Sequence, residues 1–280
     1  MQRKTVALGA EFAGLELSYL EHGLPSAPRT VVCVHGLTRN AHDFDVLAEA
    51  LAARDCRVLA IDVAGRGASG WLADPAQYDL PFYAAQIACL LDLLGVSEVD
   101  WVGTSMGGLI GIVLAAGKRP PMIRLVINDI GPFVPRQALQ QIRAYLGLDL
   151  VFKDVAELEA HLRLIHAGFG PLTDAQWRHL AVHSSRMTPE GLRLHYDPAI
   201  RAPFAAVAEQ DTDMWELWDQ VRCPTFVLRG AESPLLTPTI LEEMGRRGPP
   251  LQAVTLEGVG HAPALMADEQ VAVIIGWLGI

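Results

Sequence analysis

Ser105 stands at the centre of a sequence pattern that is typical of an activated nucleophile. Residues 103–107 read Gly-Thr-Ser-Met-Gly, the pattern G-x-S-x-G, after a predicted strand and at the start of a predicted helix. A sharp strand-to-helix turn needs small neighbours, because its backbone is strained and other segments approach it closely. The serine Oγ then projects from the sheet edge, where the helix N-terminus favours negative charge. We therefore predict that Ser105 is the nucleophile of an acyl-transfer reaction.

His261 is the histidine best placed to act as a base for that serine. It follows Gly260, after the last predicted strand and before the last predicted helix. A histidine that follows the nucleophile in chain order agrees with one known order of serine, acid and base. Among the other histidines, His179 and His183 have i, i+4 spacing, but no third ligand accompanies them in the sequence. We expect them to be solvated or packed, and we predict no metal site and no organic cofactor.

Two backbone N–H groups are expected to stabilise the oxyanion that forms when a nucleophile attacks a carbonyl. One belongs to Met106, directly after the serine, and the other to Leu37, which follows His35-Gly36 just beyond a predicted strand. Loss of one such donor typically raises the barrier by about 3 kcal/mol. The alternative interpretation of His35-Gly36 is an ordinary tight turn.

Short apolar runs and longer helical patterns alternate along the chain and must position these residues. Continuous apolar runs are typical of strands that are buried on both faces of a parallel sheet. The apolar runs lie at 30–34, 57–61, 99–102, 124–128, 225–228 and 252–256. The helical patterns lie at 43–54, 80–94, 107–117 and 264–278. An antiparallel edge pair is expected near 5–10 and 15–20, and the whole alternation predicts an α/β fold with a mostly parallel, doubly wound sheet.

The alternation stops after Pro132 and resumes near Cys223. We predict a core formed by residues 1–132 and 207–280, and a helical cap, residues 133–206, inserted after the sixth strand. Ligands of open α/β sheets bind at the carboxyl edge that this cap would cover. Cap side chains expected to line a pocket, or else to form the cap's own core, are Phe133, Tyr145, Leu146, Phe152, Leu164, Phe169, Trp177, Met187 and Phe204.

Composition and charge narrow the classes of partner. The 280 residues are 51% hydrophobic and 19% charged, with a mean hydropathy of +0.24, which excludes a disordered polyelectrolyte. The net charge of −10, without a Lys/Arg-rich run, disfavours nucleic acids and anionic membranes as partners. We see no secretory signal, no apolar run of about 18 residues and no C-x-x-C spacing. We expect a cytoplasmic protein with free thiols and a small uncharged substrate, and the oligomeric state stays open.

Four motifs, in order, resemble those of the α/β-hydrolase superfamily. They are His35-Gly36-Leu37, the pattern D-x-x-G-x-G-x-S at 62–69, the pentapeptide around Ser105, and Gly260-His261. The resemblance covers nearly the whole chain outside the insertion and is closest to esterases with a compact cap. It implies the α/β-hydrolase fold and hydrolysis of an ester or related acyl compound without a cofactor. The segment 62–69 is expected to shape a loop beside the site.

The acid that would orient His261 is the point at which the sequence departs from the superfamily pattern. The superfamily usually supplies it as G-x-x-D after the next-to-last strand, but here residues 230–233 read Gly-Ala-Glu-Ser. A serine cannot stabilise a protonated imidazole as a carboxylate does. Some superfamily members take the acid from the strand after the nucleophile's helix, so Asp129 is our preferred acid and Glu232 the reserve. Ser233 is expected to be an auxiliary hydrogen-bonding partner of His261 or Asp129.

The sequence therefore predicts a serine carboxylesterase that acts on uncharged, short-to-medium acyl or aryl esters through an acyl-enzyme. One alternative is a C–C bond hydrolase of β-diketone-like ring-cleavage products, for which a cation such as Arg39 or Arg66 would bind the substrate carboxylate. Another is a hydrolase-fold receptor that binds a ligand without catalysis, and Ser233 in place of an acid is the feature in its favour.

Overall fold

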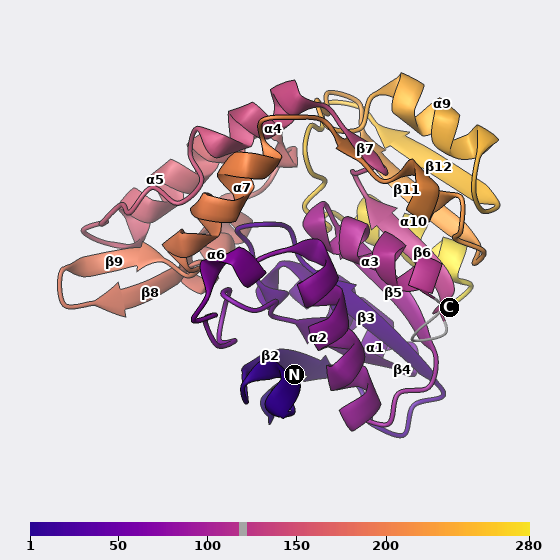
Figure 1. Ribbon diagram of the computed structural model, residues 1–280, viewed down its shortest axis with the longest axis horizontal. Coiled ribbons are helices and arrows are strands. Elements are labelled where there is room, and N and C mark those ends of the chain that lie inside the picture. The colour runs from indigo at the N-terminus through magenta and orange to yellow at the C-terminus, as the bar shows by residue number, and fades with distance from the viewer. Residues whose placement is uncertain (118–121) are drawn as a thin grey trace.

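A twisted sheet with helices on both faces forms the body of the molecule (Figure 1). The computed structural model describes residues 1–117 and 122–280. Within these ranges the central sheet has eight strands, which are, in sheet order, β1 (Gln2–Ala7), β2 (Glu16–His22), β4 (Cys56–Ile61), β3 (Arg29–Val34), β5 (Val99–Thr104), β6 (Met122–Asn128), β11 (Thr225–Gly230) and β12 (Leu251–Leu256). β1 and β2 form the expected antiparallel edge, and all neighbours from β4 to β12 are parallel. The predicted fold class is confirmed.

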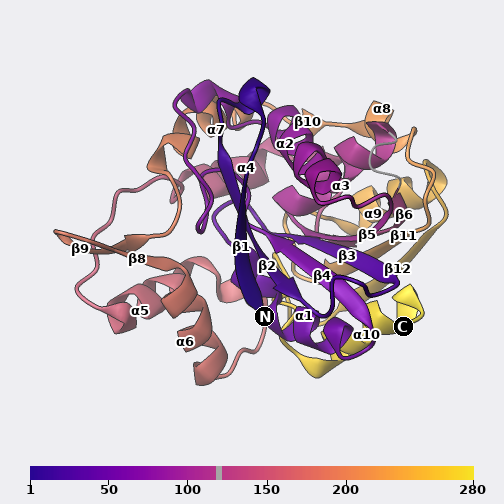
Figure 2. The same ribbon diagram turned by 90° about the horizontal axis from the view of Figure 1, so that it is seen from below.

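The central strands of the sheet are largely apolar because both of their faces are buried, whereas the edge strands β1 and β12 are partly exposed. In β3, Val32 and Val34 pack into one hydrophobic cluster, whereas Val31 and Cys33 pack into the cluster on the opposite face. Helices α2 (Leu80–Leu93), α3 (Met106–Gly117) and α9 (Pro238–Arg246) cover the first face. Helices α1 (Asp45–Ala52) and α10 (Asp268–Leu278) cover the second, as Figure 2 shows. Each face therefore has its own core, which is the arrangement that a doubly wound sheet requires.

Between β6 and β11 the chain leaves the sheet and forms a cap. Its elements are β7 (Phe133–Val134), α4 (Arg136–Arg143), α5 (Val155–Ile165), α6 (Asp174–His183), β8 (Ser185–Thr188), β9 (Gly191–Leu194), α7 (Arg201–Val207), β10 (Thr212–Asp213) and α8 (Trp215–Trp218). β7 pairs with β10, so the two ends of the cap meet where Phe133 lies opposite Asp213. The hairpin β8–β9 was not predicted, because its strands are short and contain no continuous apolar run.

The carboxyl ends of the parallel strands face the cap (Figure 1). The loops that follow β3, β5, β6 and β12 all begin at this edge. They carry Leu37, Ser105, Asp129 and His261. Cap residues approach them closely; a Cβ added at Gly168 would lie 3.1 Å from His261 N. The residues predicted to do chemistry therefore lie between the sheet and the cap. No helix in the described part of the chain is both long enough and apolar enough to cross a bilayer.

Candidate active site

Ser105, His261 and Asp129 form one continuous hydrogen-bonded chain. His261 Nε2 lies 2.8 Å from Ser105 Oγ, and His261 Nδ1 lies 2.8 Å from Asp129 Oδ2. The Asp129 side chain is fully buried, whereas the His261 side chain is 17% exposed. The distances fit a base that is bonded to the nucleophile on one side and oriented by a carboxylate on the other.

The turn between β5 and α3 holds Ser105 in a backbone conformation that few non-glycine residues adopt. Ser105 has a φ of 52°, and its N–H donates to Asn128 O at 2.9 Å. A Cβ added at Gly107 would lie 2.0 Å from Val34 O, and one added at Gly103 would lie 2.2 Å from Gly107 O. The two glycines of the pentapeptide are therefore needed because β3 and α3 approach the turn closely.

The closeness of Val34 to Gly107 predicts a large effect of one methyl group on stability. Gly107→Ala should lower the free energy of unfolding by about 3 kcal/mol or more, because the new Cβ meets backbone that cannot move aside. Gly276→Ala, on the exposed face of α10, is the matched control and should raise it by about 1 kcal/mol. Urea unfolding of both variants measures the difference, and equal stabilities would contradict the close approach.

Two hydrogen bonds with β11 fix Asp129, one through its backbone and one through its side chain. Its N–H donates to Leu228 O at 2.8 Å, and its Oδ1 accepts from Gly230 N at 2.8 Å. Like Ser105, Asp129 has a positive φ, 59°. These bonds leave Oδ2 directed at His261, so the carboxylate is fixed before any substrate binds.

Ser233 and Glu232 lie near this site but do not complete it. In contrast to the expectation from sequence, the described hydrogen bonds of Ser233 Oγ go not to His261 or Asp129 but to the N–H groups of Leu235 and Leu236, at 3.3 and 3.2 Å. Ser233 therefore closes a local turn, as short hydroxyl side chains commonly do. The Glu232 side chain is exposed to solvent. His261 Nδ1 already forms its hydrogen bond with Asp129, the acid preferred from the sequence.

Leu37 and Met106 offer two backbone donors beside Ser105. Within the described ranges neither N–H has a hydrogen-bond acceptor, and both residues line the same cavity as Ser105. Arg66, which is fully buried, donates from Nε to Leu37 O at 2.8 Å and so fixes the Leu37 peptide from its carbonyl side. The sequence did not indicate this contact, because an arginine in a glycine-rich loop is normally solvated. The arrangement is suited to binding an oxyanion.

His35 supports the Leu37 loop in its neutral form. Its Nδ1 lies 2.7 Å from Gly36 O, and its Nε2 lies 3.0 Å from Val63 N, which donates to it. Complete burial lowers the pKa of His35 to about 4, so this ring stays neutral at neutral pH. A proton on Nε2 would remove the acceptor for the Val63 N–H.

Buried neutral histidines predict a loss of stability in weak acid. Burial lowers the pKa of His35 to about 4 and that of His166 well below its usual value of 6.5. As the pH falls, these histidines are therefore protonated in the unfolded chain before they are protonated in the folded protein. Their contribution to the free energy of unfolding is fully present above pH 6.5 and is lost as the pH decreases from 6.5 towards 4. Each histidine should contribute a slope of about 1.4 kcal/mol per pH unit. Urea midpoints at pH 7.5 and 5.5, a range above most carboxyl titrations, measure the effect, and equal midpoints would contradict it.

A cavity of about 440 Å³ opens beside Ser105 between the sheet and the cap. Its walls are mainly apolar, with Leu109 and Ile130 from the core and Leu139, Ile142 and Phe204 from the cap. Acidic side chains at Asp79, Asp211 and Asp213 also contribute, and among the described residues no Lys or Arg lines it. The cavity is therefore suited to an uncharged organic group.

The cap side chains predicted from the sequence coincide only in part with those that line this cavity, and some form the cap's own core, which was the second role expected of them. Of the nine predicted, Phe204 is in the lining, whereas Phe152 and Trp177 pack in the core of the cap and Leu164 and Met187 are each 77% exposed. The helix α4 supplies Leu139 and Ile142 instead. Aromatic content does not indicate which way a side chain points, but the apolar spacing within 136–143 could have indicated this helix face.

Comparisons with known proteins agree with this geometry. Residues 31–273 match the model of the alpha/beta hydrolase family. A 3-hydroxybutyrate-oligomer hydrolase from Cupriavidus necator is 43% identical over 271 residues, which cover 93% of this chain and 92% of that protein. An esterase from Mycobacterium tuberculosis is 28% identical over 253 residues, 89% of this chain and 81% of that protein.

A solved structure shares both the fold and part of the sequence. An alpha/beta hydrolase from Novosphingobium aromaticivorans superposes with a TM-score of 0.85 at 33% sequence identity, covering 99% of this chain and 98% of that one. The family match extends over both the sheet and the cap. The chain therefore belongs to the alpha/beta hydrolase family, and it is an ester-hydrolysing member of that family.

Proposed function

We propose that this hydrolase is a serine carboxylesterase for uncharged esters with short-to-medium acyl or aryl groups. The observation that carries the proposal is that the Ser105–His261–Asp129 chain opens into an apolar cavity of about 440 Å³. A cavity with apolar walls and acidic groups at Asp79, Asp211 and Asp213 disfavours a carboxylate or phosphate on the bound group.

The proposed mechanism is acyl transfer in two steps. His261 takes the proton of Ser105 as Oγ attacks the ester carbonyl, and the N–H groups of Leu37 and Met106 stabilise the oxyanion. His261 then donates that proton to the leaving alcohol, which departs and leaves the acyl-enzyme. Water, deprotonated by His261, attacks the acyl carbonyl and releases the acid, and Ser105 regains its proton. Asp129 holds the ring in orientation throughout and stabilises its positive charge.

Two observations favour ester over C–C bond hydrolysis. The guanidinium of Arg66 donates to Ala64 O and to Tyr83 Oη, both at 2.7 Å, in addition to Leu37 O. The guanidinium of Arg39 forms two bonds with Asp43. Neither arginine lines the cavity, so neither supplies the cation that a carboxylate-bearing diketone would need.

A substrate panel tests the proposal. Turnover of p-nitrophenyl esters from acetate to laurate, of 3-hydroxybutyrate oligomers and of a carboxylate-bearing vinylogous diketone should be compared at equal concentrations. The oligomers belong in the panel because they are the substrate in the name of the relative that is 43% identical. We expect neutral esters with short or medium acyl groups to have the highest kcat/KM. Faster cleavage of the diketone than of every ester would overturn the proposal.

A further inference from the structure

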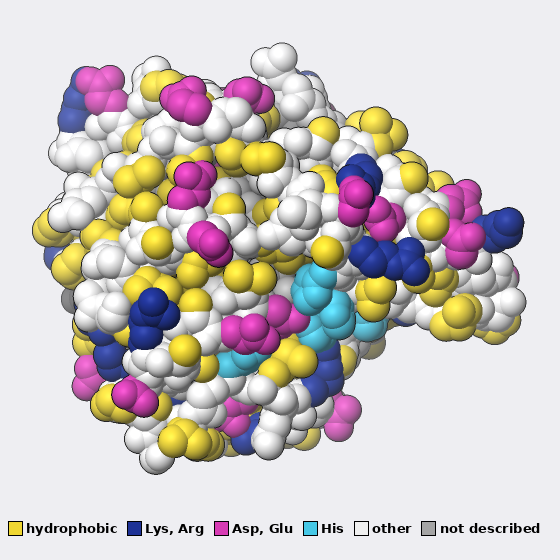
Figure 3. Space-filling view, turned by 180° about the vertical axis from the view of Figure 1, so that it is seen from behind, with side chains coloured by type: hydrophobic (Ala, Val, Ile, Leu, Met, Phe, Trp, Pro, Cys, Tyr) yellow, Lys and Arg dark blue, Asp and Glu magenta, His cyan; other side chains and the backbone are white. Residues whose placement is uncertain are grey.

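A cluster of histidines around Asp45 lies at the contact between the cap and the core, outside the active site. His42 comes from the short 3-10 helix η2 (Ala41–Phe44), and Asp45 is the first residue of α1. His179 and His183 lie one turn apart on α6, in the cap. On the face seen in Figure 3, histidine side chains gather beside acidic ones. Two segments far apart in sequence thus bring imidazoles to one carboxylate.

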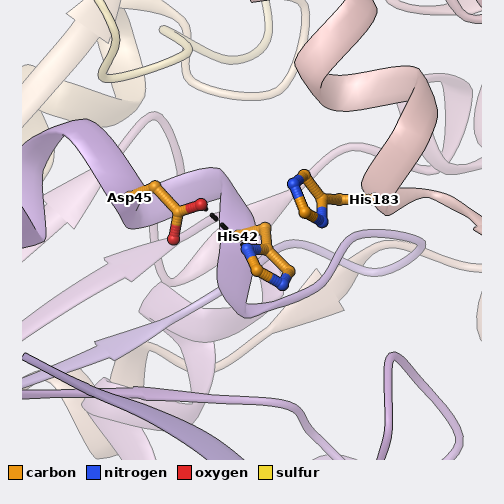
Figure 4. A group of neighbouring side chains, drawn as sticks. All are labelled: His42, Asp45 and His183. Carbon is orange, nitrogen blue, oxygen red and sulfur yellow. Dashed lines mark hydrogen bonds and ion pairs between the residues drawn. The ribbon is translucent and has the colours of Figure 1, made fainter. Parts of the chain in front are cut away.

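The polar atoms of this cluster are close enough to share one ion. Potential ligand atoms of His42, Asp45 and His183 all lie within 4.8 Å of one another (Figure 4). His42 Nδ1 is 2.8 Å from Asp45 Oδ2, and His179 Nε2 is 3.4 Å from the same oxygen. The rings of His42 and His183 are stacked with centroids 3.6 Å apart, so the two imidazoles lie against each other across the contact between cap and core.

Two buried polar atoms at the cluster have no hydrogen-bond partner among the residues that the structure describes. They are Asp45 Oδ1 and Nε2 of His22, the last residue of β2, and they lie 3.9 Å apart. An unpaired buried carboxylate oxygen carries a free-energy penalty of about 1–3 kcal/mol, and more when the group is charged. This oxygen is therefore an independent indication that a cation or donor belongs beside Asp45.

A basic side chain that contacts the cluster has a second partner of its own. The competing cation is Arg3, whose guanidinium lies 2.8 Å from His42 Nε2. Arg3 also donates to Asp62 at 2.9 Å, so it keeps an ion pair when His42 turns to another partner.

We propose that His42, Asp45, His179 and His183 bind one divalent transition-metal ion, with zinc as the preferred ion. Three imidazoles and one carboxylate match the nitrogen and oxygen ligands of tetrahedral zinc sites, whereas calcium and magnesium prefer oxygen alone. His42 coordinates through Nδ1, the nitrogen that faces Asp45, with its ring proton on Nε2, from which Arg3 withdraws. His179 exchanges its present contact with His42 O, at 3.2 Å, for the ion.

The ion would join the cap to the segment that carries the Leu37 loop. The same segment already contacts the end of α6, since Asn40 Nδ2 donates to His183 O at 2.9 Å and Arg39 donates to Ser184 Oγ at 2.7 Å. A metal with two ligands from each side adds bonds that must break before the cap separates. Metal binding should therefore stabilise the folded state and hold the cap against the core.

Binding of zinc and cobalt to tag-free, chelator-treated protein tests this site. We expect calorimetry to show one Zn²⁺ per chain, a higher Tm with Zn²⁺, and the intense visible absorption of four-coordinate Co²⁺. Loss of an outer-shell partner weakens metal sites by about 10–100-fold, so His183→Gln or Asp45→Asn, which remove direct ligands, should weaken binding by about 100-fold or more. His161→Gln, a cap histidine outside the cluster, should bind as the wild type does.

The controls separate this site from others on the chain. Melting of each variant without metal verifies folding, and His42→Gln provides a second ligand variant from the core side. The proposal is wrong if the folded wild type takes up no Zn²⁺ at micromolar concentrations. It is also wrong if uptake survives in the folded His183→Gln and His42→Gln variants but disappears in His261→Gln, because the ion would then lie at the active site.

Discussion

Replacing Ser105 by alanine should lower kcat for ester hydrolysis by about 10⁵- to 10⁶-fold. Ser105 is the group whose Oγ lies 2.8 Å from His261 Nε2 and faces the cavity, so its loss removes the covalent step altogether. The N–H groups of Leu37 and Met106 remain, and they should leave a residual rate above that of the uncatalysed reaction. Steady-state assays with a p-nitrophenyl ester, with the variant purified apart from any wild-type protein, measure the decrease.

The control for this prediction is the stability of the same variant. Serine and alanine both carry a Cβ, so the backbone strain of a φ of 52° is common to wild type and variant, and urea unfolding should change little. A folded Ser105→Ala enzyme with a kcat within tenfold of the wild type would show that another residue is the nucleophile.

Replacing Asp129 by asparagine should lower kcat by about 10⁴-fold, through the tautomer of His261. Asp129 Oδ1 accepts from the N–H of Gly230, so the oxygen of an asparagine amide keeps that place. The NH₂ group then takes the position of Oδ2 and donates to His261 Nδ1. The ring proton is forced onto Nε2, which can no longer accept the proton of Ser105.

Glu232→Gln is the matched control for Asp129→Asn, because it removes a carboxylate from the segment where the family usually places its acid. The Glu232 side chain is exposed, so the kcat of the Glu232→Gln variant should stay within about twofold of the wild type. Ser233→Ala should likewise leave kcat nearly unchanged, since its Oγ bonds with Leu235 and Leu236. A larger loss of kcat in Glu232→Gln than in Asp129→Asn would assign the acid to Glu232.

The core could be predicted from the sequence because its constraints are local. Strands buried on both faces leave apolar runs, such as residues 58–61 in the strand predicted at 57–61, and the observed strand Cys56–Ile61 is one residue longer than predicted. Ser105, Asp129 and His261 each follow a strand, and carboxyl ends of parallel strands meet at one edge. Their meeting could therefore be predicted without coordinates, although the choice between Asp129 and Glu232 stayed open.

The features that could not be predicted depend on contacts between distant segments. His42 and Asp45 come within reach of His179 and His183 only because α6 folds back on η2. The buried role of Arg66 depends on the carbonyl of Leu37 and the hydroxyl of Tyr83. The orientation of cap side chains such as Leu139 depends on how α4 lies over the sheet. The contacts of the histidine cluster and of Arg66 leave no periodic pattern in the sequence, and the apolar spacing of α4 indicates a buried face but not what that face packs against.

Covalent labelling with a fluorophosphonate, read by mass spectrometry, tests most directly whether Ser105 is an activated nucleophile. The fluorophosphonate phosphorus accepts the serine Oγ and loses fluoride, so each active chain gains a single adduct. We predict one adduct per chain, located on the peptide that contains Ser105, abolished in Ser105→Ala and strongly slowed in Asp129→Asn. No adduct on the folded wild-type protein, or an adduct on another residue, would contradict this account of the site.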